Sequence, residues 1–272
     1  MSVITITRGS LSTSFKLKSE LSELLNCRAV SREEVLKHAQ KYGIEETGLA
    51  DIAVLETQPP HFWDRHAAQR KHYLTIFKAA LMDFVVEGNV IYHGHLGQFL
   101  LHDVPKLLRI RADASVEFRV KMLMKESGRT ETEARDYINQ IDSRRVNWAR
   151  FLYGVDFNNP VNFDIVLNMD KMSIETMADI VARAAERPEF KVDESSAKIT
   201  RDVHLKALVL AYLARSPRTR GMDLSVESDA DKGYVKIKGV APALGTSIWE
   251  RDIKDVLSSI EGITKLDVTS QA

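Results

Sequence analysis

The first twenty-five residues place the strongest constraint on what this chain can fold into. Residues 3–7 (VITIT) are a β-branched run that is typical of a buried strand. Residues 8–14 (RGSLSTS) are rich in turn and cap residues. Apolar side chains then recur at helical spacing, at Phe15, Leu17, Leu21, Leu24 and Leu25. Phosphate-binding α/β proteins begin in this order, because loop amides and a helix N-terminus together form an anion site.

The loop departs from the GxxxxGK[ST] pattern of a P-loop, because it lacks a second glycine and a lysine in register. Ser12, Thr13 and Ser14 stand where glycines are expected. Their hydroxyl and amide groups can hold an anion, although less tightly than a glycine loop that wraps the phosphate. Two interpretations stay open for this segment: a weakened phosphate site, or an ordinary turn between strand and helix.

Composition narrows the class of protein. The chain has 272 residues, which suits one large domain or two smaller ones. Its 38 basic and 38 acidic residues cancel, which argues against a global attraction to nucleic acid or to a membrane surface. A single cysteine, Cys27, excludes an internal disulfide and suits a reducing cytoplasm. Neither a signal peptide nor a membrane-spanning stretch is expected, so we predict a cytoplasmic protein.

Strands and helices alternate along the first two thirds of the chain. Further strands are predicted at 90–92, 107–112 and 162–168. Helices are expected over 28–56, over 61–87, over 114–126, from 130 to an end at 142–145, and over 173–185. Ser31 and Glu34 form a capping-box pattern, and Gly43 is the expected end of the helix that they start. Alternation of this kind predicts an α/β fold with a mainly parallel sheet, whose ligands gather at the carboxyl ends of the strands.

Histidines do not predict a metal site. His61, His66 and His72 lack the spacing of a ligand set and are interpreted as ordinary polar residues. His93 and His95 share one face of a predicted strand, but no third ligand accompanies them.

Arginines are concentrated in the helical region after the third strand. Arg119, Arg135, Arg144, Arg145 and Arg150 belong to this group. Solvated helix faces with partners at i, i+4 would account for about half of them, and a guanidinium clamp on phosphates is the alternative.

Several motifs, in order, resemble the cytidylate kinase-like family, a branch of the P-loop nucleoside monophosphate kinases. Residues 4–8 (ITITR) resemble the family's "ITISR" strand, and 31–33 (SRE) resemble its "DRE" segment. Residues 89–95 (NVIYHGH) resemble "NVVIVGRG", and 163–168 (FDIVLN) resemble "YDLVIN". The stretches 108–112 and 117–119 resemble the entry to the family's lid, and 142–145 (DSRR) resemble its "DxxR" motif.

This resemblance implies a P-loop kinase-like fold and transfer of a phosphoryl group from ATP to a nucleoside monophosphate, with Mg²⁺. By matched position, the residues that bind ATP phosphates would be Arg8, Gly9, Ser10, Ser12, Thr13 and Ser14. Arg119, Arg145 and Asp142 would be the catalytic residues of the lid. Arg32 and His95 would lie near the acceptor nucleotide.

Three departures from the family pattern leave a second hypothesis open. The "GSGG" core aligns with residues 11–14 (LSTS), the aspartate of "DRE" is Ser31, and the arginine of "GRG" is His95. Each lost phosphate donor costs about 10²–10³ in rate. The alternative to an active kinase is therefore a weak or inactive relative that senses a nucleotide.

The last part of the chain predicts a small α+β domain in the order α-β-β-α-β. We divide the chain into a kinase-like domain at 1–189, a polar linker at 190–198 and a C-terminal domain at 199–272. The elements expected in that domain are a helix at 200–214, strands at 223–228 and 234–239 joined by a turn at 231–233, a helix at 245–259 and a strand at 262–268. The order resembles a BON domain, which implies a binding module for phospholipid or another ligand. A structural role or a self-association surface is the alternative.

Overall fold

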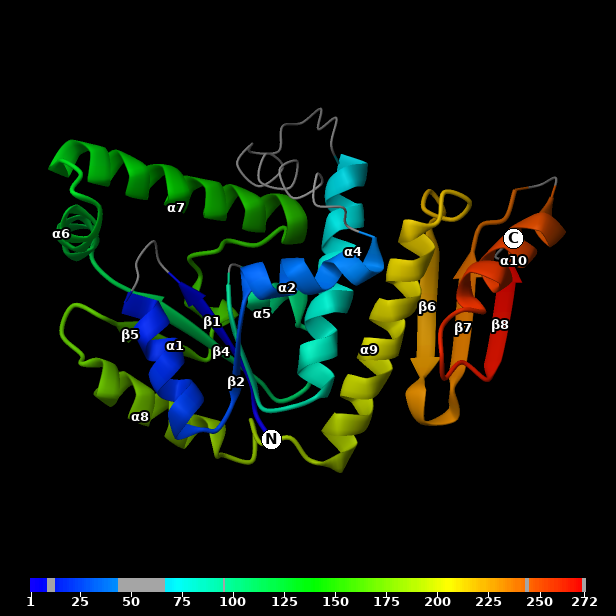
Figure 1. Ribbon diagram of the computed structural model, residues 1–272, viewed down its shortest axis with the longest axis horizontal. Helices are drawn as coiled ribbons and strands as arrows, with labels where there is room; N and C mark the ends of the chain where they lie inside the picture. The colour runs from blue at the N-terminus through cyan, green and yellow to red at the C-terminus, as the bar shows by residue number, and fades with distance from the viewer. Residues whose placement is uncertain (9–12, 44–66, 95, 243–244, 271–272) are drawn as a thin grey trace.

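Strand β1 (Val3–Arg8) lies at the centre of a five-stranded parallel sheet (Figure 1). The computed structural model describes residues 1–8, 13–43, 67–94, 96–242 and 245–270. Four further strands complete the sheet: β2 (Arg28–Ser31), β3 (Val90–His93), β4 (Leu107–Asp113) and β5 (Ile165–Asn168). The strand order is β2-β3-β1-β4-β5, and every pairing is parallel. This confirms the predicted α/β class.

Helices cover both faces of the sheet, so the strands are buried on both sides, as expected for parallel sheets. Helices α1 (Thr13–Leu24) and α8 (Ile174–Ala185) pack on one face, where Ile4 and Ile6 meet Leu17 and Leu21. On the other face lie α2 (Arg32–Ala39), α4 (Ala67–Val86) and the short α5 (Gly97–Leu100). Of the apolar positions predicted for the first helix, Phe15 and Leu24 are exposed.

Residues 28–31 form a strand, so the prediction of a helix from residue 28 is wrong there. Strand β2 pairs with β3 at the edge of the sheet, and its four residues are too few for a period to be read from the sequence. The capping box that follows is confirmed: the Glu34 amide donates to Ser31 Oγ at 3.2 Å, and the Ser31 amide donates to Glu34 Oε2 at 2.7 Å. After a 3₁₀ turn, η1 (Gln40–Tyr42), Gly43 ends the segment with φ +90°.

Helices α6 (Val116–Ser127) and α7 (Glu131–Tyr153) form a helical pair beside the sheet (Figure 1). The predicted end of the second helix at 142–145 is wrong, because α7 continues to Tyr153 and is capped by Gly154, whose φ is +65°. The four polar residues at 142–145 resemble a helix end, but Trp148 and Ala149 continue the buried stripe beyond them. The pair has its own small core, made of Val120, Leu123, Ala134 and Ile138.

The C-terminal part has the predicted α-β-β-α-β order. Its elements are α9 (Glu194–Arg215), β6 (Leu224–Asp229), η3 (Ala230–Lys232), β7 (Tyr234–Gly239), α10 (Thr246–Leu257) and β8 (Lys265–Ser270). Strand β7 lies in the middle, antiparallel to β6 and parallel to β8. Gly233, with φ +58°, closes the predicted turn between β6 and β7. A short 3₁₀ turn, η2 (Pro160–Asn162), precedes β5 in the larger sheet.

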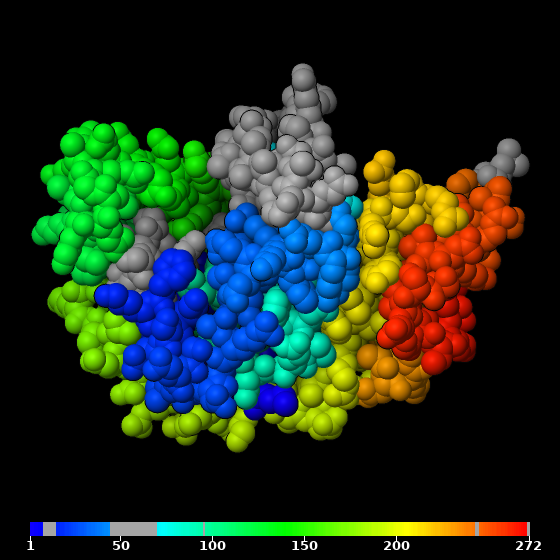
Figure 2. Space-filling view, viewed as in Figure 1, coloured from blue at the N-terminus to red at the C-terminus, as the bar shows by residue number. Residues whose placement is uncertain are grey.

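Helix α9 joins the two sheets. Ala207 and Ala211 belong to the core that α4 covers, whereas Leu205, Val209 and Leu213 belong to the core of the smaller sheet. The space-filling view shows the residues of α9 between the two parts (Figure 2). Residues 194–198, assigned above to a linker, are the first residues of α9. The domain boundaries themselves stay a prediction.

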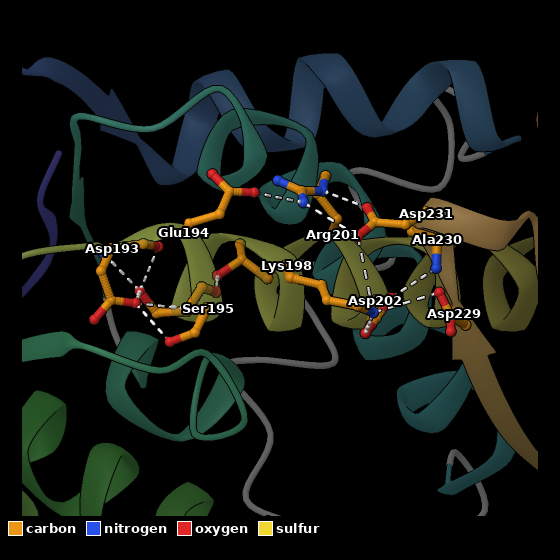
Figure 3. Close-up of polar contacts among 11 residues, drawn as sticks. Asp193, Glu194, Ser195, Lys198, Arg201, Asp202, Asp229, Ala230 and Asp231 are labelled. Atoms are coloured by element: carbon orange, nitrogen blue, oxygen red, sulfur yellow. Dashed lines mark hydrogen bonds and ion pairs between the residues drawn. The ribbon is translucent and has the colours of Figure 1, made fainter.

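Polar contacts fix η3 to the first half of α9 (Figure 3). Asp202 Oδ1 accepts a hydrogen bond from the Ala230 amide at 2.6 Å, and Arg201 Nε lies 2.9 Å from Asp231 Oδ1. The Arg201 contact lowers the pKa of the Asp231 carboxyl. The smaller sheet is thus tied to α9 by polar contacts as well as by its core.

Asp83 of α4 connects three parts of the chain. Its carboxylate, 14% exposed, contacts His38 Nε2 at 2.9 Å, Lys41 Nζ at 2.7 Å and His204 Nε2 at 2.7 Å. The Tyr42 hydroxyl donates to it at 2.8 Å. Burial alone would raise the pKa of Asp83, but hydrogen bonds from His204, Lys41 and Tyr42 outweigh burial and lower it. Because His204 belongs to α9, the charge of Asp83 helps to hold α9 against the larger sheet.

We predict that Asp83→Asn lowers the free energy of unfolding by about 2 kcal/mol at pH 7, the range for hydrogen bonds to a charged group. Because folding lowers the pKa of Asp83, its ionised form stabilises the fold at pH values above 3.8, the ordinary pKa of this carboxyl group. This stabilisation is lost as the pH falls below that value. The difference between the two proteins in urea unfolding should therefore shrink below about pH 4. Asp179→Asn, at an exposed position of α8, is the control. A difference that grows as the pH falls would contradict this account.

Candidate functional site

The carboxyl ends of β1, β3 and β4 meet where the chain reverses its direction across the sheet. Strand β1 lies between β3 and β4, so the path from β3 to β4 passes over it. Arg8 is paired in register with Ala112 of β4, and Ile6 with His93 of β3. Crevices at such switch points are where open α/β sheets bind ligands.

A polar cavity of about 330 Å³ opens at this edge. It is bounded by β1, by β4 and the start of α6, by α7, and by the segment that precedes η2. Its polar and charged lining residues are Thr7, Arg111, Asp113, Ser115, Arg119, Asp142, Arg145 and Asn158. Three arginines against two aspartates make this cavity suitable for an anion.

Arg119 and Asp142 form an ion pair between α6 and α7 inside the polar cavity. Arg119 Nη1 lies 2.9 Å from Asp142 Oδ1, and Arg119 Nη2 lies 2.7 Å from Oδ2. The contact is therefore bidentate, the stronger form of such a pair. Arg119 is only 6% exposed, and its buried Nε atom has no hydrogen-bond partner among the described residues. Arg119 therefore brings a fixed positive charge to the lining of the cavity.

Arg111 and Asp113 were missed by the sequence analysis as site residues. Arg111 Nη2 lies 2.8 Å from Asp113 Oδ2, and the guanidinium lies over the Phe157 ring at 5.3 Å. Both residues alternate with buried ones along β4 and reach its carboxyl end. That alternation in a buried parallel strand, where polar residues are uncommon, is the signal that could have identified them.

A second, aromatic cavity has a volume of about 260 Å³. Tyr73, Phe77, Tyr92 and Trp148 contribute rings to it, together with leucines from α5 and α7. Its charged lining residues are Arg32, Glu33, Arg144 and Arg145. Arg145 therefore lines both cavities, and it is the described charged residue that they share.

Gly97, the first residue of α5, is closely packed against a ring of the aromatic cavity. A Cβ atom added to Gly97 would lie 2.6 Å from Cδ1 of Tyr92, a distance that real Cβ atoms do not reach. Glycine is therefore required at the start of α5, where the backbone passes the Tyr92 ring.

The predicted site residues divide into three groups. Arg119, Asp142 and Arg145 come together in the polar cavity, and Arg32 lies with Arg145 in the aromatic one. Arg8 is the last residue of β1, and Thr13 and Ser14 are the first residues of α1. Gly9, Ser10, Ser12 and His95 lie outside the described residues.

The described lining of the polar cavity suits phosphate oxygens better than a directly bound cation. Both oxygens of Asp142 contact Arg119, and those of Asp113 contact Arg111 and the Ala114 amide. Among the described residues, no group of three or more His, Cys, Asp or Glu side chains is placed to hold a metal ion.

In the described part of the chain, no helix is both long and apolar enough to cross a bilayer.

Comparisons with known proteins agree with the geometry. The family profile described as "Cytidylate kinase-like family" matches residues 3–171. A cytidylate kinase of Sulfurisphaera tokodaii is 30% identical over 97 residues, which is 35% of this chain and 52% of that protein. A cytidylate kinase of Pyrococcus horikoshii is 29% identical over 114 residues, which is 41% of this chain and 57% of that protein. The chain thus spans about half the length of the curated relatives it matches.

A solved structure of an uncharacterized protein from Eubacterium ventriosum has the same fold. The match to this structure has a TM-score of 0.50 and a sequence identity of 16%, and it covers 67% of this chain and 97% of that chain. At this identity the likeness concerns the fold alone.

We predict that Asp142→Asn costs about 2 kcal/mol of unfolding free energy, because it leaves the buried Arg119 charge without its counter-charge. Asp136→Asn, at an exposed position of the same helix, should change stability by less than about 0.5 kcal/mol. Urea unfolding of both variants measures the difference. Equal stabilities would show that the pair does not hold α6 to α7.

Proposed function

Because the chain belongs to the cytidylate kinase-like family, we propose that it binds ATP and a nucleoside monophosphate at this edge of the sheet and transfers a phosphoryl group between them. In that reaction the bond between the β–γ bridging oxygen and the γ-phosphorus breaks, and an oxygen of the monophosphate forms a bond to that phosphorus. The products are ADP and a nucleoside diphosphate. Positioning and charge neutralisation account for most of such catalysis.

The position of Arg145 carries this proposal. It lines the polar cavity, where we place the ATP phosphates, and the aromatic cavity, where we place the acceptor. Arg145 is therefore placed to contact both the phosphates of the donor and the phosphate of the acceptor. A guanidinium at the boundary favours the negative charge that is shared between donor and acceptor during transfer.

The acceptor assignment rests on the chemistry of the aromatic cavity. A nucleotide base is a flat ring that packs well against aromatic side chains, and the rings of Trp148 and Tyr92 are part of the lining of this cavity. Arg32 and Arg144 line the same cavity and suit the phosphate of a monophosphate.

Arg119 has a different role in this proposal from Arg145. Asp142 holds it in place, and burial keeps it rigid. Its fixed positive charge faces a cavity that also contains Arg145, so it adds to the field at the phosphates without having to move. Magnesium, which the family implies, would arrive with ATP and neutralise phosphate charge.

A second candidate function follows from the residues at 11–14. The family's glycines are replaced there by LSTS, which weakens the wrapping of a phosphate by the backbone. A protein that senses a nucleotide without rapid turnover is therefore the alternative. The C-terminal unit has the element order of a BON domain, and we propose that it binds a ligand or partner in either case.

We predict that CMP or ATP raises the melting temperature, and that Arg145→Ala reduces this shift. A tenfold loss of affinity removes about 1.4 kcal/mol of ligand stabilisation, equal to about 3 °C for a protein of this size. Arg150→Ala, at an exposed position of the same helix, should keep the full shift. If no nucleotide shifts the melting temperature at millimolar concentration, both candidate functions fail.

We also predict magnesium-dependent turnover in a screen of nucleoside monophosphates with ATP, and a roughly 100-fold lower kcat in Arg119→Lys. Lysine keeps the charge but loses the bidentate contact with Asp142. Arg135→Lys is the matched control, because Arg135 also bridges α6 and α7 but is 40% exposed. Nucleotide binding without turnover would favour the sensing function. Unchanged kcat in Arg119→Lys would remove Arg119 from the mechanism.

A further inference from the structure

A third cavity lies where α9 meets the larger sheet, away from the carboxyl edge of β1. It measures about 400 Å³ and is bounded by α4, by α5 and the residues after it, by the end of α7, and by α9. We name it the junction cavity. Its size falls within the range of small-molecule sites in proteins, about 300–1,000 Å³.

Aromatic and aliphatic side chains form most of its wall. The rings of Phe99 and Tyr153 are stacked, with centroids 5.1 Å apart and an angle of 26° between planes. Phe151 also lines the cavity and remains 43% exposed, which is unusual for a ring of this size. Leu74 and Val203 add aliphatic surface from α4 and α9. This wall fits a flat apolar group.

The charged residues of the junction cavity are mainly basic. They are Arg70, Lys71, Lys78 and Lys206, against Asp103 alone. Asp103 contacts Lys78 Nζ with both oxygens at 2.8 Å, so its charge is already matched.

Two of the lysines are available to a ligand. Lys71 Nζ lies 3.8 Å from Asp223, and because both side chains are highly exposed, this pair contributes little. Lys206 forms no ion pair within the described ranges of the chain, and it lines the cavity from α9, whereas Lys71 and Lys78 line it from α4. A negatively charged group would therefore meet basic residues from both parts of the molecule.

We propose that the junction cavity binds a small aromatic anion, with its ring against the Phe99, Phe151 and Tyr153 wall and its acidic group between Lys71 and Lys206. Nucleotides and aryl carboxylates share this chemistry. The proposal does not depend on the phosphotransferase activity.

A ligand in the junction cavity would affect the candidate functional site. The junction and aromatic cavities share Leu74, Leu100 and Leu152 as a common wall. The Arg70 guanidinium, only 2% exposed, lies 4.8 Å from the Trp148 ring, and these two residues line opposite sides of that wall. Helix α7 supplies residues to both cavities and carries Arg145.

Fluorescence titration with 8-anilino-1-naphthalenesulfonate, an aromatic monoanion, tests the site in the full chain. Wild-type protein should give a saturable enhancement, and Lys206→Glu should weaken the affinity at least tenfold. Lys121→Glu, at an exposed position of α6 that lines none of the three cavities, should leave the affinity unchanged. The neutral probe N-phenyl-1-naphthylamine should bind more weakly, with no response to Lys206→Glu.

Two outcomes of the titration would overturn the proposal. The first is equal affinity of the anionic probe for wild type and Lys206→Glu, with both proteins folded by circular dichroism. The second is loss of binding in Arg144→Glu but not in Lys206→Glu, which would place the probe in the aromatic cavity.

Competition then identifies the class of ligand. Displacement of the probe by CMP with equal potency in wild type and Arg145→Ala supports a nucleotide in the junction cavity, and displacement by 2-naphthoate supports an aryl carboxylate. Displacement by 2-naphthol as effective as by 2-naphthoate would show that charge is not recognised, and would contradict the proposal.

Discussion

The ion pair between Arg119 and Asp142 is the constraint on which the candidate site depends. It joins α6 to α7 at the edge of the sheet, and α7 carries Arg145 one turn beyond Asp142. The pair therefore sets where Arg145 stands relative to β1 and β4. It also fixes a positive charge in a polar cavity, because Arg119 is buried and cannot move away to solvent. An anion in this cavity meets charges that are already oriented, which is how electrostatic stabilisation operates without reorganisation.

Helix α9 gives the molecule a second constraint, because it serves two cores and contacts Asp83 through His204. Through α9, the C-terminal unit therefore packs against α4, which covers one face of the larger sheet. The two parts are not joined by a flexible linker alone. The junction cavity lies along this contact, and one of its walls is a wall of the aromatic cavity. A ligand held there would act on α7 through packed side chains, which are the physical means by which distant sites are coupled.

Much of the fold could be predicted from local patterns. Four of the five strands were predicted from short, mainly apolar runs, and Ser31, Gly43 and Gly233 were identified from cap and turn chemistry. Strand β2 was missed because four residues carry no readable period, and it is defined by its pairing with β3. For the candidate site, motif order pointed to Arg119, Asp142 and Arg145, which the fold brings together. Arg111, Asp113 and the aromatic cavity were missed, because they arise from contacts between residues far apart in the chain.

The most direct test of this account is a crystal structure of the protein with CMP and the non-hydrolysable ATP analogue adenylyl imidodiphosphate. The account predicts phosphate oxygens in the polar cavity within hydrogen-bond distance of Arg145, and the cytosine ring in the aromatic cavity beside Trp148. Both cavities empty at saturating nucleotide, or nucleotides bound elsewhere on the molecule, would contradict it.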